Sequence, residues 1–270
     1  VYGSDESDDS DEEQSGYINF YNASHNAPAV YLTIDENIEE DESDEIEKTF
    51  TAIEYGRSTG RLEVPSNQYY VELAWQDEDN NDRDNLEIIY EDKITISEFD
   101  TNFIVLSEDI KQPNVNFYSI PTIDDDNDDI EALFNAQFLN IHSGYDAIDV
   151  FMSKSDESFN EAVFVEQLSY GNLTNNTKFD QDEYIFYITV PNSGEILFQS
   201  DEVSFGYSSQ YVIAIRENKG IDDSPFILDK ISTSNITEFQ HNNAISKFRV
   251  FNAIESHHLL PTTMASLIYI

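Results

Sequence analysis

Clusters of carboxylates are the residues of this chain best suited to chemistry. One cluster, at 124–129, reads DDDNDD, and another, at 77–82, reads DEDNND. Calcium prefers hard oxygen donors of this kind. Neither cluster fits an EF-hand loop, because the first has no Gly at the turn and neither ends in a correctly spaced Glu. Two interpretations stay open: a solvated linker whose charges repel, and a calcium site that stiffens a junction. The predicted calcium ligands are Asp124, Asp125, Asp126, Asp128 and Asp129.

The residue patterns of other metal and catalytic sites are missing from the sequence. The five histidines form no HExxH motif, and there is no cysteine for a disulfide or a thiolate ligand. Ser, His and Asp are all present, but no GxSxG elbow and no Gly-rich phosphate loop accompany them. Paired carboxylates follow from composition alone in so acidic a chain and carry no glycosidase signal. We therefore predict no catalytic residue, no enzyme activity and no cofactor other than calcium.

The charge balance bears on location and partners. With 55 acidic against 13 basic residues, the formal net charge is −42. Such a field repels nucleic acid and anionic membrane surfaces, and it suits a saline or calcium-rich exterior. No apolar run approaches the roughly 18 residues of a membrane-spanning helix. We predict a secreted or cell-surface protein. Its acidic segment 1–16 is interpreted as a tether of the kind that follows a cleaved signal or a lipid anchor before residue 1.

Three asparagines stand where an apolar strand gives way to a turn. They are Asn22, Asn140 and Asn252. Asn side chains stabilise such turns by bonding their own backbone. We predict a structural turn at each position.

The asparagines also mark an internal repeat. Asn22 aligns with Asn140 at an offset of 118 residues, and 54–75 aligns with 169–190 at an offset of 115. A third block, 88–106, resembles 196–215 with small gaps. Matched blocks in the same order indicate a tandem duplication.

Within each repeat, short segments alternate apolar and polar residues with a period of two, as strands do. Examples are YYVELAW, KITISEF, YIFYITV and YVIAI. The predicted fold is all-β, with two tandem Ig-like antiparallel β-sandwiches plus a C-terminal strand extension. The predicted parts are an acidic tether (1–16), a first sandwich (17–122), an acidic linker (123–132), a second sandwich (133–232), and a linker with C-terminal strands (233–270).

The start of each repeat carries a motif found in a known family. A strand ending in Asn-Ala (18–23) is followed by a Ser-to-Pro turn (24–28) and a second strand (29–34), and a Tyr-Gly pair comes later in each copy. In these features the chain resembles the bacterial and archaeal family called domain of unknown function 4397. The second copy has Asp146 in place of the Pro, and the Arg of the family's first strand occurs here only as Arg249. The resemblance implies exported, cell-envelope Ig-like sandwiches with no known catalytic residues.

A third repeat begins at 247–270 and is incomplete. Two strands cannot bury their apolar faces alone, and they expose unpaired edges. Three interpretations stay open: the chain is cut from a longer array, the segment folds back on the second sandwich, or it pairs with a neighbouring molecule's sheet. The predicted strand-pairing residues are Phe248, Val250, Phe251, Leu267, Ile268, Tyr269 and Ile270.

These features favour a non-enzymatic, extracellular structural or adhesive surface protein. In the most specific version, it is a filament subunit that assembles by strand pairing of its C-terminal segment. The predicted partners are other copies of the chain or other cell-envelope proteins, and not nucleic acid. The alternative is an extracellular binding module for a glycan or small molecule, with aromatic-rich loops as its site. A cell-envelope hydrolase ranks third.

Overall fold

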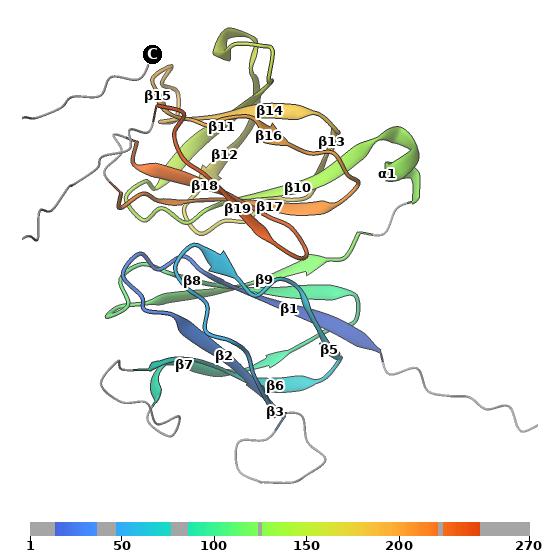
Figure 1. Cartoon of the computed structure of the whole chain (residues 1–270), viewed down its shortest axis with the longest axis vertical. Coiled ribbons are helices and arrows are strands. Elements are labelled where there is room, and N and C mark those ends of the chain that lie inside the picture. The colour runs from blue at the N-terminus through green and yellow to red at the C-terminus, as the bar shows by residue number, and fades with distance from the viewer. Residues whose placement is uncertain (1–13, 37–46, 77–85, 124–125, 221–223, 244–270) are drawn as a thin grey trace, which may run out of the picture.

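Segments with a two-residue period form strands, and their apolar faces close two cores. The computed structural model describes residues 14–36, 47–76, 86–123, 126–220 and 224–243. Along β6 (Gln68–Gln76), for example, Tyr69, Val71 and Leu73 are buried and the residues between them are not. The prediction of an all-β chain with tandem sandwiches is confirmed (Figure 1).

The first sandwich consists of two sheets. Sheet A contains β4 (Arg57–Ser58), β5 (Leu62–Pro65), β1 (Ser15–Asn22), β8 (Asp100–Ser107) and β9 (Asn114–Pro121). Sheet B contains β3 (Glu47–Thr49), β2 (Val30–Asp35), β6 and β7 (Leu86–Thr95). Their facing side chains form one core, with Phe20 and Ile104 from sheet A against Leu32 and Val71 from sheet B.

The second sandwich repeats this plan. Sheet C contains β13 (Thr177–Asp180), β10 (Leu133–Asn140), β17 (Gln210–Glu217), β18 (Phe226–Ile231) and β19 (Ile236–Phe239). Sheet D contains β12 (Val163–Ser169), β11 (Ala147–Lys154), β14 (Glu183–Thr189), β15 (Ile196–Gln199) and β16 (Val203–Ser204). Its core is richer in aromatic rings, and Phe134 stacks on Phe205 with 4.1 Å between ring centroids.

Each sandwich contains one parallel strand pair among antiparallel ones. β1 runs parallel to β8, with Tyr17 opposite Thr101. β10 runs parallel to β17, with Asn135 opposite Gln210. The two registers coincide when β1 is matched to β10 at an offset of 118 (Tyr17 to Asn135) and β8 to β17 at an offset of 109 (Thr101 to Gln210). The structure therefore shows the same strand plan in both halves of the chain.

Two segments differ from the expected parts. Within the predicted linker 123–132, residues Asp126–Glu131 form the short helix α1. The second sandwich also continues past residue 232, because β19 pairs with β18 as the edge strand of sheet C. A one-turn 3-10 helix, η2 (Phe159–Glu161), precedes β12. Among the described residues, no helix has the length and apolar character to cross a membrane.

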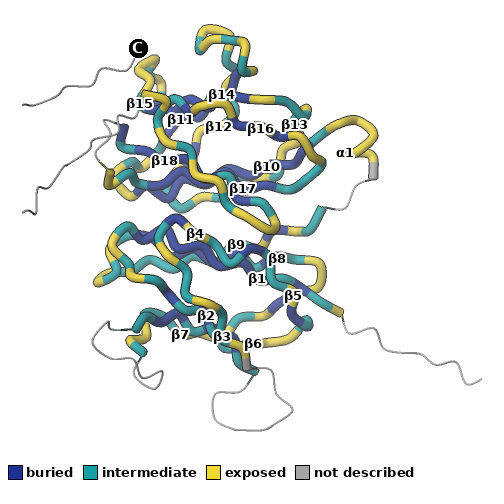
Figure 2. The backbone as a smooth tube through the Cα atoms, viewed as in Figure 1, coloured by how far each residue is buried: buried dark blue, intermediate teal, exposed yellow. Residues whose placement is uncertain are grey.

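The four sheets stack as layers in the order D, C, A and B (Figure 1). Sheets A and C lie at the centre, and Figure 2 shows buried residues along β1 and β10. These central strands are covered on both faces, so they are apolar almost continuously, as in FIVL (103–106) and VIAI (212–215).

Candidate binding groove and the junction between the sandwiches

Sheets A and C bury a third apolar cluster between them, which we call the junction. Its side chains from the first sandwich are Tyr21, Ala23, Phe103, Val105 and Ile120, and those from the second are Leu139, Ile141, Val212, Ala214 and Ile231. Val105 and Ala214, which are equivalent at the offset of 109, are both fully buried. This shared apolar cluster holds the two sandwiches against each other, so they are not independent domains joined only by a linker.

The contacts across the junction are reciprocal. The Tyr55 hydroxyl donates to the Glu217 carbonyl oxygen at 2.7 Å. The equivalent Tyr170 donates to the Glu108 carboxylate, and Glu108 is the equivalent of Glu217. When residue i of one repeat contacts residue j of the other and j contacts i, the two units are related by an approximate two-fold axis. The repeats therefore pack as a symmetric dimer would, within one chain.

One end of the junction carries buried charge. Arg216 Nε donates to Asp229 Oδ2 at 2.6 Å, and both side chains are almost completely buried. The Tyr21 hydroxyl donates to the same carboxylate from the other sandwich, and the Tyr55 ring lies 4.4 Å from the guanidinium carbon. Burial, and then the adjacent Asp229 charge, raises the pKa of Tyr21, so its hydroxyl stays a neutral donor. The pair is thus completed only when the sandwiches meet.

The opposite end of the junction is neutral at the equivalent positions. Ser107 stands in the place of Arg216, Asn116 in that of Asp229, and Leu139 in that of Tyr21. The Nδ2 atom of Asn116 is buried with no hydrogen-bond partner among the described residues. The two ends of a formally symmetric junction are therefore chemically different.

The two long sides of the junction, which we call its rims, also differ: one is closed and the other leaves a groove. On one rim the sandwiches close on each other: Arg61 N donates to the Thr233 carbonyl oxygen at 2.7 Å. Gly60 precedes Arg61 with φ +72°, a left-handed backbone conformation that favours glycine. Only a cavity of about 40 Å³ remains, lined by Asn19, Thr101, Ile231 and Ser232 among others.

On the equivalent rim the sandwiches stay apart and leave a groove of about 450 Å³. Asn175 and Asn176 occupy the places of Gly60 and Arg61 at the repeat offset of 115. The first sandwich lines the groove with Phe117, Tyr118, Ser119, Pro121 and Ile123. The second lines it with Gln137, Leu173, Thr174, Asn175, Asn176 and Gln210. With this volume and a lining of polar and apolar side chains, the groove is a candidate ligand site on the described part of the chain.

Hydrogen bonds hold the polar groups of the groove in place. Gln137 Nε2 donates to the Thr174 carbonyl oxygen at 2.8 Å, and Gln210 Nε2 donates to the Pro121 carbonyl oxygen at 2.9 Å. The Tyr118 hydroxyl donates to the Gly171 carbonyl oxygen at 2.8 Å. Burial raises the pKa of Tyr118 to about 12, so this donor is neutral at ordinary pH. The described lining of the groove thus presents preorganised amides and the Tyr118 ring, and its residues are uncharged.

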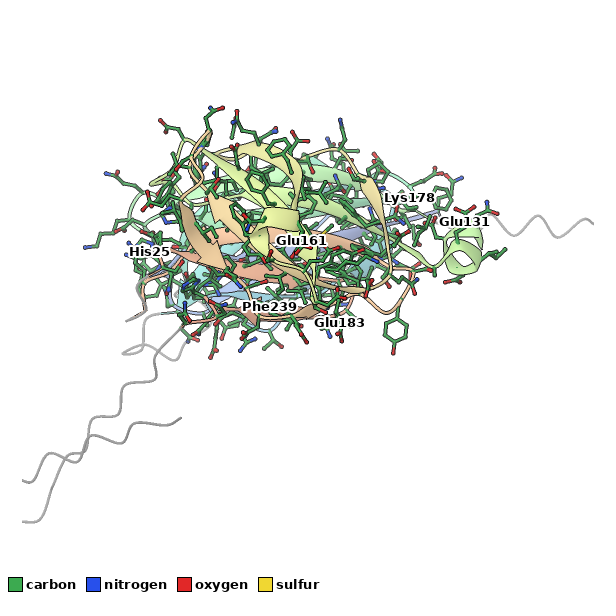
Figure 3. All side chains as sticks on the ribbon, turned by 90° about the horizontal axis from the view of Figure 1, so that it is seen from above. His25, Glu131, Glu161, Lys178, Glu183 and Phe239 are labelled. Atoms are coloured by element: carbon green, nitrogen blue, oxygen red, sulfur yellow. The ribbon has the colours of Figure 1, made fainter. Side chains whose placement is uncertain are left out.

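Only some of the predicted calcium ligands lie in the described part of the chain. Asp124 and Asp125 lie outside the described residues, and Asp126 and Asp129 belong to α1. The carboxylate of Asp128, the remaining ligand, accepts from Lys178 Nζ at 2.5 Å and from Asn135 Nδ2 at 2.6 Å. Lys178 lies beside this helix (Figure 3). Asp128 thus joins α1 to β10 and β13, and the described residues hold no cluster of three or more metal-binding side chains.

Two of the three predicted turn asparagines lie in the described part of the chain, and both are buried and make turn contacts. Asn22 Oδ1 accepts from Ser24 N at 3.2 Å, and Asn22 Nδ2 donates to the Ile53 carbonyl oxygen at 3.0 Å. Asn140 Oδ1 accepts from His142 N at 3.0 Å in the second repeat. Asn252 and the predicted strand-pairing residues Phe248, Val250, Phe251, Leu267, Ile268, Tyr269 and Ile270 lie outside the described residues.

Sequence reasoning missed the groove residues. Gln137, Gln210 and Asn176 come from three separate strands or loops, and no local spacing connects them. One signal was available: the repeat alignment places Asn175-Asn176 opposite Gly60-Arg61, so the two copies differ at a loop that the alignment otherwise matches.

Comparisons with known proteins identify no family. No protein-family model matches the chain, and no curated protein matches it. Solved structures match at low TM-scores. A leucine-rich repeat protein from Bacteroides thetaiotaomicron is 12% identical with a TM-score of 0.21, over 74% of this chain and 26% of that one. The chain thus spans about a quarter of that protein's length.

Two further matches cover nearly all of the other chain. A candidate adhesin from Bacteroides ovatus is 9% identical with a TM-score of 0.23, over 85% of this chain and 96% of that one. A family CBM26 carbohydrate-binding module from Eubacterium rectale, solved with maltoheptaose, is 12% identical with a TM-score of 0.22, over 83% and 96%. Similarities at this level carry no argument about function, which has to come from the chain's own residues.

Proposed function

We propose that this chain is an extracellular structural or adhesive protein of the cell surface, which assembles by strand pairing between copies. The net charge of −42 supports an exterior, salt-rich location, because self-repulsion is screened there. The junction supports a mechanical role, because it joins two sandwiches into one four-layer unit. The resemblance to domain of unknown function 4397 and calcium binding near 124–129 belong to the same proposal.

The observation that carries the assembly proposal is the free edge of sheet D. β12 is the edge strand, and its Val163 and Phe164 side chains are 66% and 53% exposed. Phe164 lies against Phe151, with ring centroids 5.5 Å apart. An apolar edge strand presents unpaired backbone groups and invites another strand. The proposed occupant is the C-terminal segment 247–270 of a second copy, whose SLIYI sequence is apolar and strand-forming.

Electron microscopy and light scattering of the full chain and two edge variants test this proposal. Val163→Lys places a charge on the β12 edge and should leave monomers where the parent chain forms elongated assemblies. Ile88→Lys is the matched control, because Ile88 is 56% exposed on β7, the edge of sheet B. It should assemble like the parent. A monomeric parent chain, or a Val163→Lys variant that assembles equally well, contradicts the proposal.

A second candidate function is a ligand-binding module, and the groove between the sandwiches favours it. The groove combines a volume of about 450 Å³ with fixed amides and aromatic side chains. This is the composition of small-molecule sites, which are concave and hold a few placed polar groups. Binding and assembly use different surfaces, so each can be tested alone.

A further inference from the structure

The groove is open for a reason specific to this chain. An approximate two-fold axis predicts two equivalent rims, and one of them is closed by the backbone bond from Arg61 to Thr233. The other rim does not keep the Gly60-Arg61 pair, and residue 175 lacks the positive φ that Gly60 has. Instead, two Asn side chains stand there, and a groove more than ten times as large as the opposite cavity remains.

The lining has an unusual charge for this protein. Acidic residues number 55 in the chain, yet none of the described lining residues is charged. Phosphates, nucleotides and uronic acids need cations to offset their desolvation, and the described lining offers none. The described lining also has no carboxylate of its own to pair with a cationic ligand, and the nearby Asp100 carboxylate already accepts from Ser119 Oγ at 2.8 Å. The groove chemistry therefore favours an uncharged ligand.

The polar groups suit a ligand with many hydroxyls. Amide side chains present donors and acceptors together, which matches a hydroxyl group that also does both. Asn175 is exposed on the rim, and the buried Oδ1 of Asn176 accepts from no described donor. A donor that reaches this oxygen relieves the cost of an unpaired acceptor. The Tyr118 ring, on the face of sheet A that is turned to the second sandwich, supplies flat apolar surface, against which the C–H face of a sugar ring packs. The neighbouring Phe117 ring packs on Tyr90 in the core of the first sandwich.

We propose that the groove binds a neutral oligosaccharide, which deepens the second candidate function by naming its ligand class. The volume of about 450 Å³ lies in the range of roughly 300–1,000 Å³ typical of small-molecule sites.

Isothermal titration calorimetry of the full chain tests the inference, with cellohexaose, maltohexaose and chitohexaose as neutral probes and hexagalacturonate as a charged one. At least one neutral probe should bind at one site, and hexagalacturonate should not. Asn175→Ala should weaken binding about threefold to tenfold, the effect of one lost neutral hydrogen bond. Asn175→Trp, which places a bulky ring at the exposed rim of the groove, should abolish it.

Asn172→Ala is the matched control, because Asn172 is exposed in the same loop and does not line the groove. It should bind like the parent. All proteins are produced in a host without N-glycosylation, since Asn172 and Asn175 both stand in N-x-Thr sequons. Three results overturn the inference: no neutral probe binds at millimolar concentration, binding survives Asn175→Trp, or only hexagalacturonate binds. The last would leave a ligand-binding function standing with another ligand class.

Discussion

His142 shows how a single side chain can depend on one protonation state. Its Nδ1 atom accepts from Gly144 N at 3.1 Å, and its Nε2 atom lies 3.1 Å from the Pro225 carbonyl oxygen, to which it can only donate. Both contacts are satisfied together by the neutral tautomer with hydrogen on Nε2. A proton on Nδ1 would break the bond from Gly144. The geometry thus agrees with the effect of burial, which lowers the pKa of His142 against the opposing charge of Glu217.

A lowered His pKa has a defined effect on stability. Below the usual His pKa of about 6.5, the unfolded chain binds a proton that the folded chain resists, so stability falls as pH decreases through this range. The folded chain keeps its full stability above about pH 6.5. It loses part of this stability as the pH falls from about 6.5 toward the lower pKa that His142 has in the folded chain. We expect His142→Gln, measured by urea unfolding at pH 7 and pH 5, to lose less stability on acidification than the parent. An equal loss in both proteins would show that His142 does not contribute.

The buried pair of Arg216 and Asp229 could not be predicted from the sequence. Both residues lie in strands that read as ordinary alternating segments, and their partner Tyr21 is about 200 residues away in the chain. The turn roles of Asn22 and Asn140 were accessible, because an Asn side chain bonds backbone only two residues on. What separates the two cases is the sequence distance over which the contact is made.

At the scale of elements, the two repeats place a Gly in the same turn with different surroundings. Gly56 and Gly171 have φ values of +69° and +72°, and each N–H donates to the carbonyl oxygen of the equivalent Asn, Asn22 or Asn140. A Cβ on Gly56 would lie 2.7 Å from Arg216 Nη2, whereas one on Gly171 would meet nothing within 4 Å. Both glycines thus have the same left-handed backbone conformation, but only a side chain on residue 56 would clash with a neighbour.

This pair gives a matched prediction. Gly171→Ala should cost about 1–2 kcal/mol of stability, the penalty of a left-handed conformation with a side chain. Gly56→Ala should cost more, about 2–4 kcal/mol, because it also displaces the buried Arg216 from Asp229. Urea unfolding of both variants measures the difference. Equal losses would mean that Arg216 moves freely and that the buried pair tolerates the displacement.

Element prediction from the sequence succeeded for strands and missed α1. The period of two identifies a strand without knowledge of its neighbours, as in YIFYITV, which forms β14. A six-residue acidic helix has little intrinsic stability, and α1 is held by the contacts of Asp128 with Lys178 and Asn135. Those contacts come from the tertiary fold, so the composition of 123–132 predicted an acidic linker and missed both the helix and the burial of Asp128.

At the scale of the whole molecule, the stacking of the two sandwiches into four layers was not predicted from the strand pattern. The duplication was visible, and so was one apolar face for each strand. The runs FIVL in β8 and VIAI in β17 also carried a signal for burial on both faces, because a half-exposed strand alternates instead. Which two faces would meet remained open, since any pair of apolar sheets could have been joined.

The junction makes a prediction about cooperativity. Each sandwich has its own core, and the junction couples them through residues such as Val105, which is fully buried at its centre. The parent chain should therefore unfold in a single calorimetric transition. Val105→Lys buries an unpaired charge between the sheets, which costs several kcal/mol or forces them apart. Its unfolding should split into two transitions, one for each sandwich, at lower temperature than in the parent. Val105→Ala, which weakens the junction without adding charge, should keep one transition. A single transition in Val105→Lys, or two in the parent, would show that the sandwiches are not coupled through this surface.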